Sequence, residues 1–128
     1  MPRPRRFPIG IRIKELRIGE GEVATKGRIA LIHFDCFLPR GEKVASSRDQ
    51  PQPIQFQIGQ RRTIPGIESG IVGMAVGGLR SVRVSPQLTY YEQKTLPNVA
   101  LRYEIELLRL SDTWDATFGA GPGYLADK

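Results

Sequence analysis

Apolar and polar residues alternate along much of the chain, and a period of two indicates β-strands. The alternation begins at residues 9–13, but Leu16 falls out of phase with it, which predicts a β-bulge near Glu15. Residues 28–38 are apolar on both faces near the middle, a pattern that favours a central strand. The sequence Pro39-Arg40-Gly41 predicts the turn that ends this strand.

Three later segments repeat the strand pattern. Residues 54–58 alternate isoleucine and phenylalanine with glutamine, which predicts a strand with one buried face. Residues 79–85 place Val82 and Val84 on one side. The clearest strand comes last, with a single apolar face formed by Val99, Leu101, Tyr103, Ile105 and Leu107.

One segment follows a helical period instead. Pro65 suits the first turn of a helix. Ile67, Ile71 and Met74 then fall at positions i, i+4 and i+7, which puts them on one apolar face. Gly77-Gly78 is the expected end of this helix, because glycine commonly follows a helix C-terminus.

Strands, a single helix and further strands predict an α+β fold, an antiparallel sheet curled around one short helix. We divide the 128 residues into a basic arm (1–8), one domain (9–110) and a tail (111–128). The tail contains glycine and proline but also the aromatic residues Trp114, Phe118 and Tyr124. Two interpretations stay open for it: packing on its own domain, or docking on a partner or a second copy.

The formal net charge of +6 is unevenly distributed. Residues 1–14 contain five basic residues and no acidic one, whereas the other 114 residues contain 14 basic and 13 acidic ones. The arm is either a solvated leader or a weak attachment to an anionic surface. Because the charge excess rests on residues 1–14 alone, a nucleic-acid partner is not expected.

The composition excludes several kinds of chemistry. One cysteine and one histidine allow neither an internal disulfide nor a zinc site, so no metal or cofactor is expected. His33 and Cys36 lie three apart on a predicted strand and should point to opposite faces, which argues against a nucleophilic pair. We expect no membrane span and no secretory signal, and a reducing cytoplasm as the compartment.

Seven short motifs then occur in a fixed order. They are IHF at 32–34, GEKVASS at 41–47, IQFQIG at 54–59, TIPGIESG at 63–70, MAVG at 74–77, VSPQLTY at 84–90 and LPNVALRYEIELL at 96–108. In this order and spacing the chain resembles the FKBP-type peptidyl-prolyl cis–trans isomerases, the macrolide-binding immunophilins. The resemblance spans residues 9–110 and implies a five- or six-stranded antiparallel sheet wrapped on the helix.

The resemblance also implies a site. Its catalytic positions are Tyr90, Ile64 and Ile67. Its substrate-binding positions are Phe34, Val44, Ala45, Ile54, Phe56, Thr63 and Tyr103. The reaction rotates an X–Pro bond and breaks none, so it needs no strong acid, base or metal.

The implied site departs from the family at several positions. Phe34 and Ala45 stand where the family has a tyrosine and an aspartate that hydrogen-bond each other, and Ile67 stands where the family has a tryptophan. These replacements predict weak turnover and weaker macrolide binding. Two functions stay open: a weak isomerase acting on proline-containing peptides, or a non-catalytic peptide-binding module or holdase chaperone that binds unfolded segments during protein folding.

Overall fold

A computed structural model describes residues 10–49, 53–60, 65–86 and 100–115 of the chain. They form six strands, one 3-10 turn and one helix. The elements in chain order are β1 (Ile11–Arg17), β2 (Ile29–Phe37), β3 (Lys43–Ser46), η1 (Ser47–Asp49), β4 (Ile54–Gln57), α1 (Pro65–Ile71), β5 (Leu79–Val84) and β6 (Leu101–Ser111).

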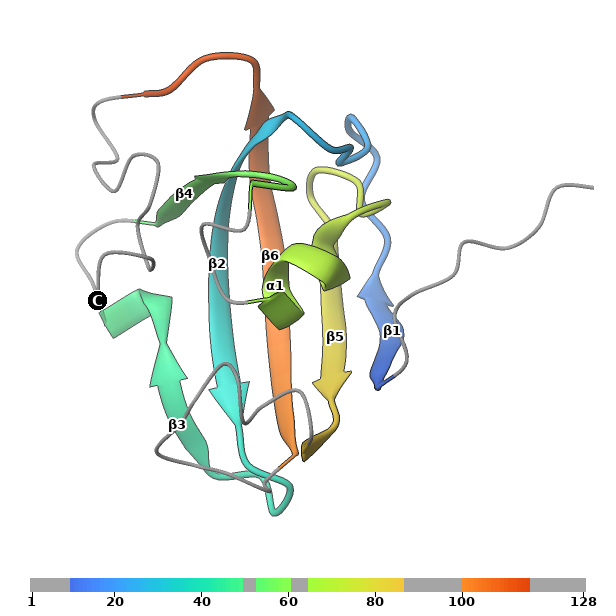
Figure 1. The fold of residues 1–128 in the computed structure, drawn as a ribbon, viewed down its shortest axis with the longest axis vertical. Helices are drawn as coiled ribbons and strands as arrows, with labels where there is room; N and C mark the ends of the chain where they lie inside the picture. The colour runs from blue at the N-terminus through green and yellow to red at the C-terminus, as the bar shows by residue number, and fades with distance from the viewer. Residues whose placement is uncertain (1–9, 50–52, 61–64, 87–99, 116–128) are drawn as a thin grey trace, which may run out of the picture.

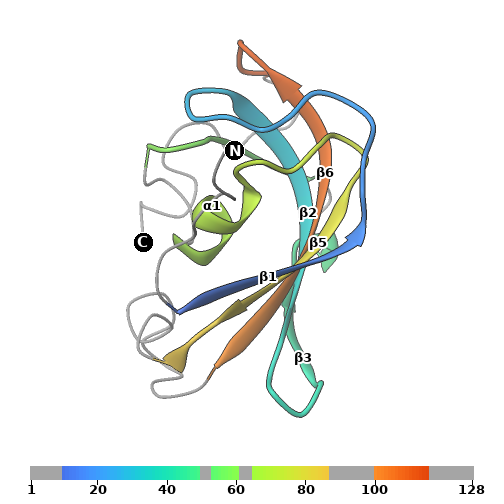
Figure 2. The ribbon, with the colours of Figure 1, turned by 90° about the vertical axis from the view of Figure 1, so that its right-hand side faces the viewer.

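The six strands form one antiparallel sheet with the order β1-β5-β6-β2-β3, and β4 also pairs with β2 (Figure 1). The sheet is curved, and α1 lies on its concave side (Figure 2). The predicted α+β fold is therefore confirmed. The central position predicted for residues 28–38 is also confirmed, because β2 pairs with β3, β4 and β6.

The strand register shifts at three places among the described residues, one of which lies between Cys36 and Phe37, where β2 pairs with β3. The register of β1 against β5 shifts between Glu15 and Arg17, as predicted from Leu16, which is out of phase with the alternation of apolar and polar residues. The third shift lies between Leu31 and Ile32 of β2, where β6 accommodates an extra residue. This shift restores Leu110 to the buried face, because one added residue reverses the side to which every later side chain points.

The helix is shorter than the sequence predicts. α1 ends at Ile71, not at Gly77-Gly78, and Gly73 follows with a positive φ of 89°. That backbone conformation suits glycine, and Gly73 follows the last helical residue by two positions. Gly77 and Gly78 instead form a separate turn, in which the Gly78 N–H donates to the carbonyl of Ala75 at 2.9 Å.

Strand β4 is buried on more than the one face that the sequence predicts. Gln55 is only 2% exposed. Its Nε2 donates to the carbonyl of Asp115 at 2.9 Å, and its Oε1 accepts the Asp115 N–H at 2.8 Å. Because both ends of the amide have partners, the glutamine is buried without an unsatisfied polar group.

The same contact holds the beginning of the tail against the domain. Strand β6 runs to Ser111, one residue into the predicted tail, and the carboxylate of Asp112 lies 2.9 Å from Nε of Arg28. Phe118 and Tyr124 lie outside the described residues, as does the basic arm, so the division at 8 and 110 stays a prediction. None of the helices within the described residues is both long and apolar enough to cross a membrane.

Candidate active site

Five of the residues implied by the resemblance meet in one apolar cluster between α1 and the concave face of the sheet. They come from four elements, since Ile67 lies on α1, Phe34 on β2, Ile54 and Phe56 on β4, and Tyr103 on β6. All five are buried. The rings of Phe34 and Tyr103 meet edge to face, with centroids 6.0 Å apart and an interplanar angle of 61°. The cluster belongs to the apolar core and is assembled from distant parts of the chain.

A close approach between α1 and β5 brings Ile67 onto the sheet. Gly70 faces Val82, and a Cβ added to Gly70 would lie 2.7 Å from Cγ2 of Val82. Real side chains do not come so close, so only glycine allows this separation. Ile67 and Ile71 then pack fully buried against the strands, as their i, i+4 spacing predicts.

The start of α1 is tied to the loop that follows β4. The carboxylate of Glu68 is buried, and its Oε1 accepts the N–H of Gly59 at 2.9 Å. This contact uses a backbone donor that has no strand partner after β4 ends. It fixes α1 relative to β4, the two elements that supply Ile67 and Phe56.

The end of α1 is tied to the sheet by a buried arginine, Arg80, which sequence reasoning missed. Its Nη1 donates to the carbonyl of Gly70 at 2.6 Å and to that of Val72 at 3.1 Å. Its Nε and Nη2 bind the carboxylate of Glu15 on β1, with a shortest distance of 2.6 Å. The available signal was the spacing, because Arg80 lies two residues before Val82 and therefore shares its buried face.

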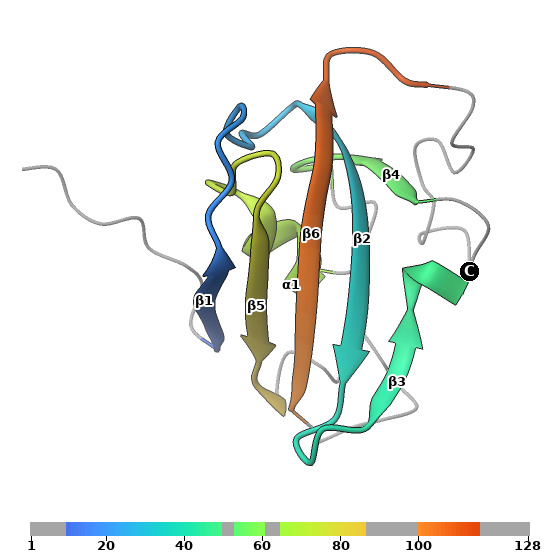
Figure 3. The same ribbon diagram turned by 180° about the vertical axis from the view of Figure 1, so that it is seen from behind.

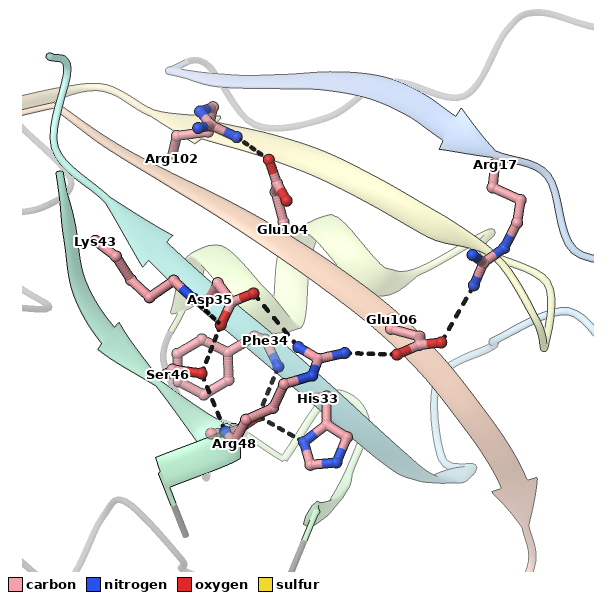
Figure 4. A network of polar contacts seen from close by, with 11 residues as sticks. Arg17, His33, Phe34, Asp35, Lys43, Ser46, Arg48, Arg102, Glu104 and Glu106 are labelled. Atoms are coloured by element: carbon pink, nitrogen blue, oxygen red, sulfur yellow. Dashed lines mark hydrogen bonds and ion pairs between the residues drawn. The ribbon is translucent and has the colours of Figure 1, made fainter. Parts of the chain in front are cut away.

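Phe34 is held through its backbone. The hydroxyl of the buried Ser47 accepts the N–H of Phe34 at 2.7 Å and lies 2.9 Å from Nδ1 of His33 (Figure 4). Burial lowers the pKa of His33 below its ordinary value, and the nearby Arg48 lowers it further. Nδ1 of the neutral ring can therefore accept a hydrogen bond from the serine hydroxyl, while the oxygen of the same hydroxyl accepts a hydrogen bond from the Phe34 N–H.

An ion-pair network on the outer face holds η1 beside the sheet (Figure 4). Arg48 lies between two carboxylates, with Nη2 at 2.6 Å from Glu106 on β6 and Nη1 at 3.4 Å from Asp35 on β2. Glu106 also binds Arg17, at 3.2 Å. Because Ser47 lies next to Arg48 in η1, the network helps to position the serine that binds Phe34.

The remaining substrate-binding positions on β3 differ from the cluster in burial. Val44 is 44% exposed, and Ala45 is exposed as well. Ala45 pairs with Cys36, whose side chain is buried on the concave side, so Ala45 lies on the side of the sheet that faces the cluster. The position at which the family has an aspartate therefore presents only a methyl group.

Three implied residues lie outside the described part of the chain. They are Thr63 and Ile64, which directly precede α1, and Tyr90, which lies between β5 and β6. Their places at the site stay predictions. The described residues contain no group of three or more potential metal ligands among histidine, cysteine, aspartate and glutamate.

The prediction for His33 and Cys36 is confirmed. The histidine contacts Ser47, whereas the cysteine belongs to the core cluster. Their positions three apart on β2 put the two side chains on opposite faces. They cannot act together as a nucleophile and base.

Residues 20–108 match the family model described as FKBP-type peptidyl-prolyl cis-trans isomerase. The chain belongs to this family. The FKBP match begins in the loop after β1 and includes all the strands that supply the apolar cluster. The predicted resemblance is confirmed, and the family is one of isomerases that act on peptidyl-prolyl bonds.

Individual FKBP proteins are similar over most of the chain. The peptidyl-prolyl cis-trans isomerase FKBP1A of Xenopus laevis is 33% identical over 107 residues, which cover 80% of this chain and 99% of that protein. An FK506-binding protein of Neisseria meningitidis is 31% identical over 105 residues, covering 79% of this chain and 96% of that protein. A 46 kDa FK506-binding nuclear protein of Spodoptera frugiperda is 28% identical, over 25% of its own length.

Proposed function

We propose that this FKBP-family chain isomerises X–Pro bonds at the apolar cluster around Ile67, and that its turnover is weak. The observation that carries the proposal is the convergence of Phe34, Ile54, Phe56 and Tyr103 around Ile67. Rotation about the peptide bond is opposed by a barrier of about 18–20 kcal/mol, which arises from amide resonance. A dry apolar surface favours the twisted amide, because that state is less polar than the planar one.

Each site residue has a proposed role. Ile67 is the floor beneath the proline ring, and Ile64 is an apolar wall. The hydroxyl of Tyr90 donates a hydrogen bond to a substrate carbonyl, which adds about 1–3 kcal/mol if the bond forms only with the twisted amide. The remaining substrate contacts come from Phe34, Val44, Ala45, Ile54, Phe56, Thr63 and Tyr103.

Two replacements support weak activity. Ile67 offers a proline less contact area than the family's tryptophan, so dispersion and burial both contribute less. Ala45 and Phe34 together lack the carboxylate and hydroxyl of the family, so no polar group is available to orient a substrate there. The same loss supports poor binding of macrolides such as FK506, a ligand named in the relatives from Neisseria and Spodoptera.

A second candidate function is a non-catalytic module or holdase that binds proline-containing or unfolded segments in the cytoplasm. It is favoured by the half-exposed Val44 beside the exposed Ala45, an apolar rim with no polar group to orient a reacting amide. Burial of apolar peptide side chains needs only such a surface.

A protease-free turnover assay with a proline peptide tests the first function. We expect a catalysed rate above background, a decrease in kcat/KM of about one to two decades in Tyr90→Phe, and loss of activity in Ile64→Asp. Ile18→Asp is the matched control, because Ile18 is 77% exposed in the loop after β1 and its replacement should leave turnover unchanged. No rate above background at high enzyme concentration would overturn the isomerase function.

Titration of the isotopically labelled protein with the same peptide distinguishes the two functions. Shifts confined to the amides of Phe34, Ala45 and Ile67, without turnover, would establish binding alone. Shifts together with turnover would establish catalysis at this surface. Turnover with unchanged shifts there would place the site elsewhere.

A further inference from the structure

The pairing of β5 with β1 and β6 places basic residues next to one another that are distant in the sequence. Arg12 on β1 lies directly opposite Arg83 on β5, and Arg83 lies directly opposite Arg102 on β6. Residues paired in this way point to the same face. Arg12 and Arg83 are exposed, and both alternate with residues that face the core, so they lie on the outer face of the sheet. Figure 3 shows this face, with β1, β5 and β6 side by side.

This juxtaposition is costly unless something compensates it. Like charges directly opposite on neighbouring strands are destabilising. Among the ion pairs of the described residues, none involves Arg12 or Arg83. The acids on the same face are already bound to other bases: Glu104 to Arg102, Asp35 to Lys43 and Arg48, and Glu106 to Arg17 and Arg48. The two arginines therefore present uncompensated charge to solvent.

More basic residues stand close to Arg12 in the sequence. Lys14 lies two residues after Arg12, on the same exposed face of β1. The segment 1–9, which joins the chain just before β1, adds three arginines and no acid. With Arg12 and Arg83 these bases number six, which equals the formal net charge of +6, and the other thirteen bases equal the thirteen acids in number. The sequence alone points to the arm, whereas the register adds Arg83 from the other half of the domain.

The surroundings of the arginines indicate what could bind them. A protein partner normally needs an apolar interface core. Of the large exposed apolar residues within the described part of the chain, Ile18, Val23 and Val44 lie outside β1 and β5, which leaves Leu16 near the end of β1. A single leucine does not make such a core. Single strands bind by base stacking, but the nearest ring on this face, Phe37, is covered by Arg102 at 4.3 Å from its centroid. Guanidinium groups suit phosphate, which they bind through two parallel hydrogen bonds.

We propose that the outer face of β1 and β5, with Arg12, Lys14 and Arg83, binds the phosphate backbone of a nucleic-acid duplex without reading its sequence. The arginines exchange condensed counterions for direct contacts, so binding weakens with salt. This surface is separate from the apolar cluster, which lies on the opposite, concave side of the sheet. The proposal therefore stands whether or not the chain is an active isomerase.

The test measures binding of a fluorescently labelled 20-bp DNA duplex by anisotropy between 50 and 200 mM salt. The variant Arg12→Gln/Arg83→Gln should weaken binding at least tenfold at 50 mM salt and make the slope of log K against log salt shallower by about two, since each phosphate contact contributes roughly −0.9. A second duplex of unrelated sequence should bind equally well. Turnover of a proline peptide should not change in this variant.

The matched control is Lys26→Gln/Arg40→Gln, which removes the same charge from exposed positions outside the patch. It should change duplex affinity less than twofold. An equal loss in both variants would show that net charge alone acts, and would overturn the proposal. So would tighter binding of polyglutamate or of single-stranded DNA than of the duplex, or no duplex binding at 50 mM salt.

Discussion

Nη1 of Arg80 lies 2.6 Å from the carbonyl oxygen of Gly70, so a strand arginine closes the end of the helix that carries Ile67. The contact is buried, and the same guanidinium binds Glu15 on the edge strand. A single side chain thus joins β1, β5 and α1. The position of Ile67, the floor of the candidate site, therefore depends on Arg80, which lies outside the site itself.

We predict that Arg80→Met lowers the free energy of unfolding by about 2–3 kcal/mol, because the carbonyls of Gly70 and Val72 lose a charged donor. Urea denaturation monitored by circular dichroism measures the change. Arg83→Met is the matched control on the same strand, and its exposed position predicts a change within about 0.5 kcal/mol. Equal effects would show that the buried contact contributes nothing particular.

We predict that stability decreases as pH falls below about 6.5, because the pKa of His33 is lower in the folded state than in the unfolded one. The unfolded chain then binds more protons, so this contribution is complete above the unfolded pKa and is lost as pH falls through the folded pKa. His33 is the sole histidine. Urea midpoints at pH 7.5, 6.5 and 5.5 should decrease in the native chain and stay flatter in His33→Gln. Parallel decreases in both would contradict the assignment.

We predict that Ala45→Asp and Phe34→Tyr act together. Ala45→Asp alone places a carboxylate beside an apolar cluster, and Phe34→Tyr alone buries a hydroxyl, so each single variant should lose stability. The double variant should recover about 0.5–3 kcal/mol as coupling energy, through the hydrogen bond that the family has. Thermal unfolding of the four proteins measures the cycle. Strict additivity would show that the two side chains do not meet.

We predict that Gln55→Met costs about 1–2 kcal/mol and accelerates hydrogen exchange at the amide of Asp115. Both ends of the glutamine amide bind that residue's backbone. Gln57→Met is the control, since Gln57 donates one bond to the Gly27 carbonyl, at 3.0 Å on an exposed side. Exchange at Asp115 that is unchanged in Gln55→Met would show that the segment is held by other contacts.

The residues of the candidate site could be predicted from the sequence only where they belong to one of the seven family-like motifs. The order of motifs identified Phe34, Phe56, Ile67 and Tyr103, and the structure places all four in one cluster. Neither Arg80 nor Ser47 was among these residues. Their roles depend on backbone groups of α1 and β2, and no local pattern in the sequence records which backbone groups a side chain will reach.

The sequence by itself determined where the strands lie and where the helix begins, because a period of two, a period of 3.6 and the fixed φ of proline are local properties. Only the tertiary structure decided which polar residues are buried. Gln55 stands on the polar side of an alternating strand, yet it is buried against Asp115, 60 residues away. Arg80 is charged, yet it is buried and binds Glu15, 65 residues away. It also set Arg12 opposite Arg83, since strand pairing joins segments that no local pattern connects.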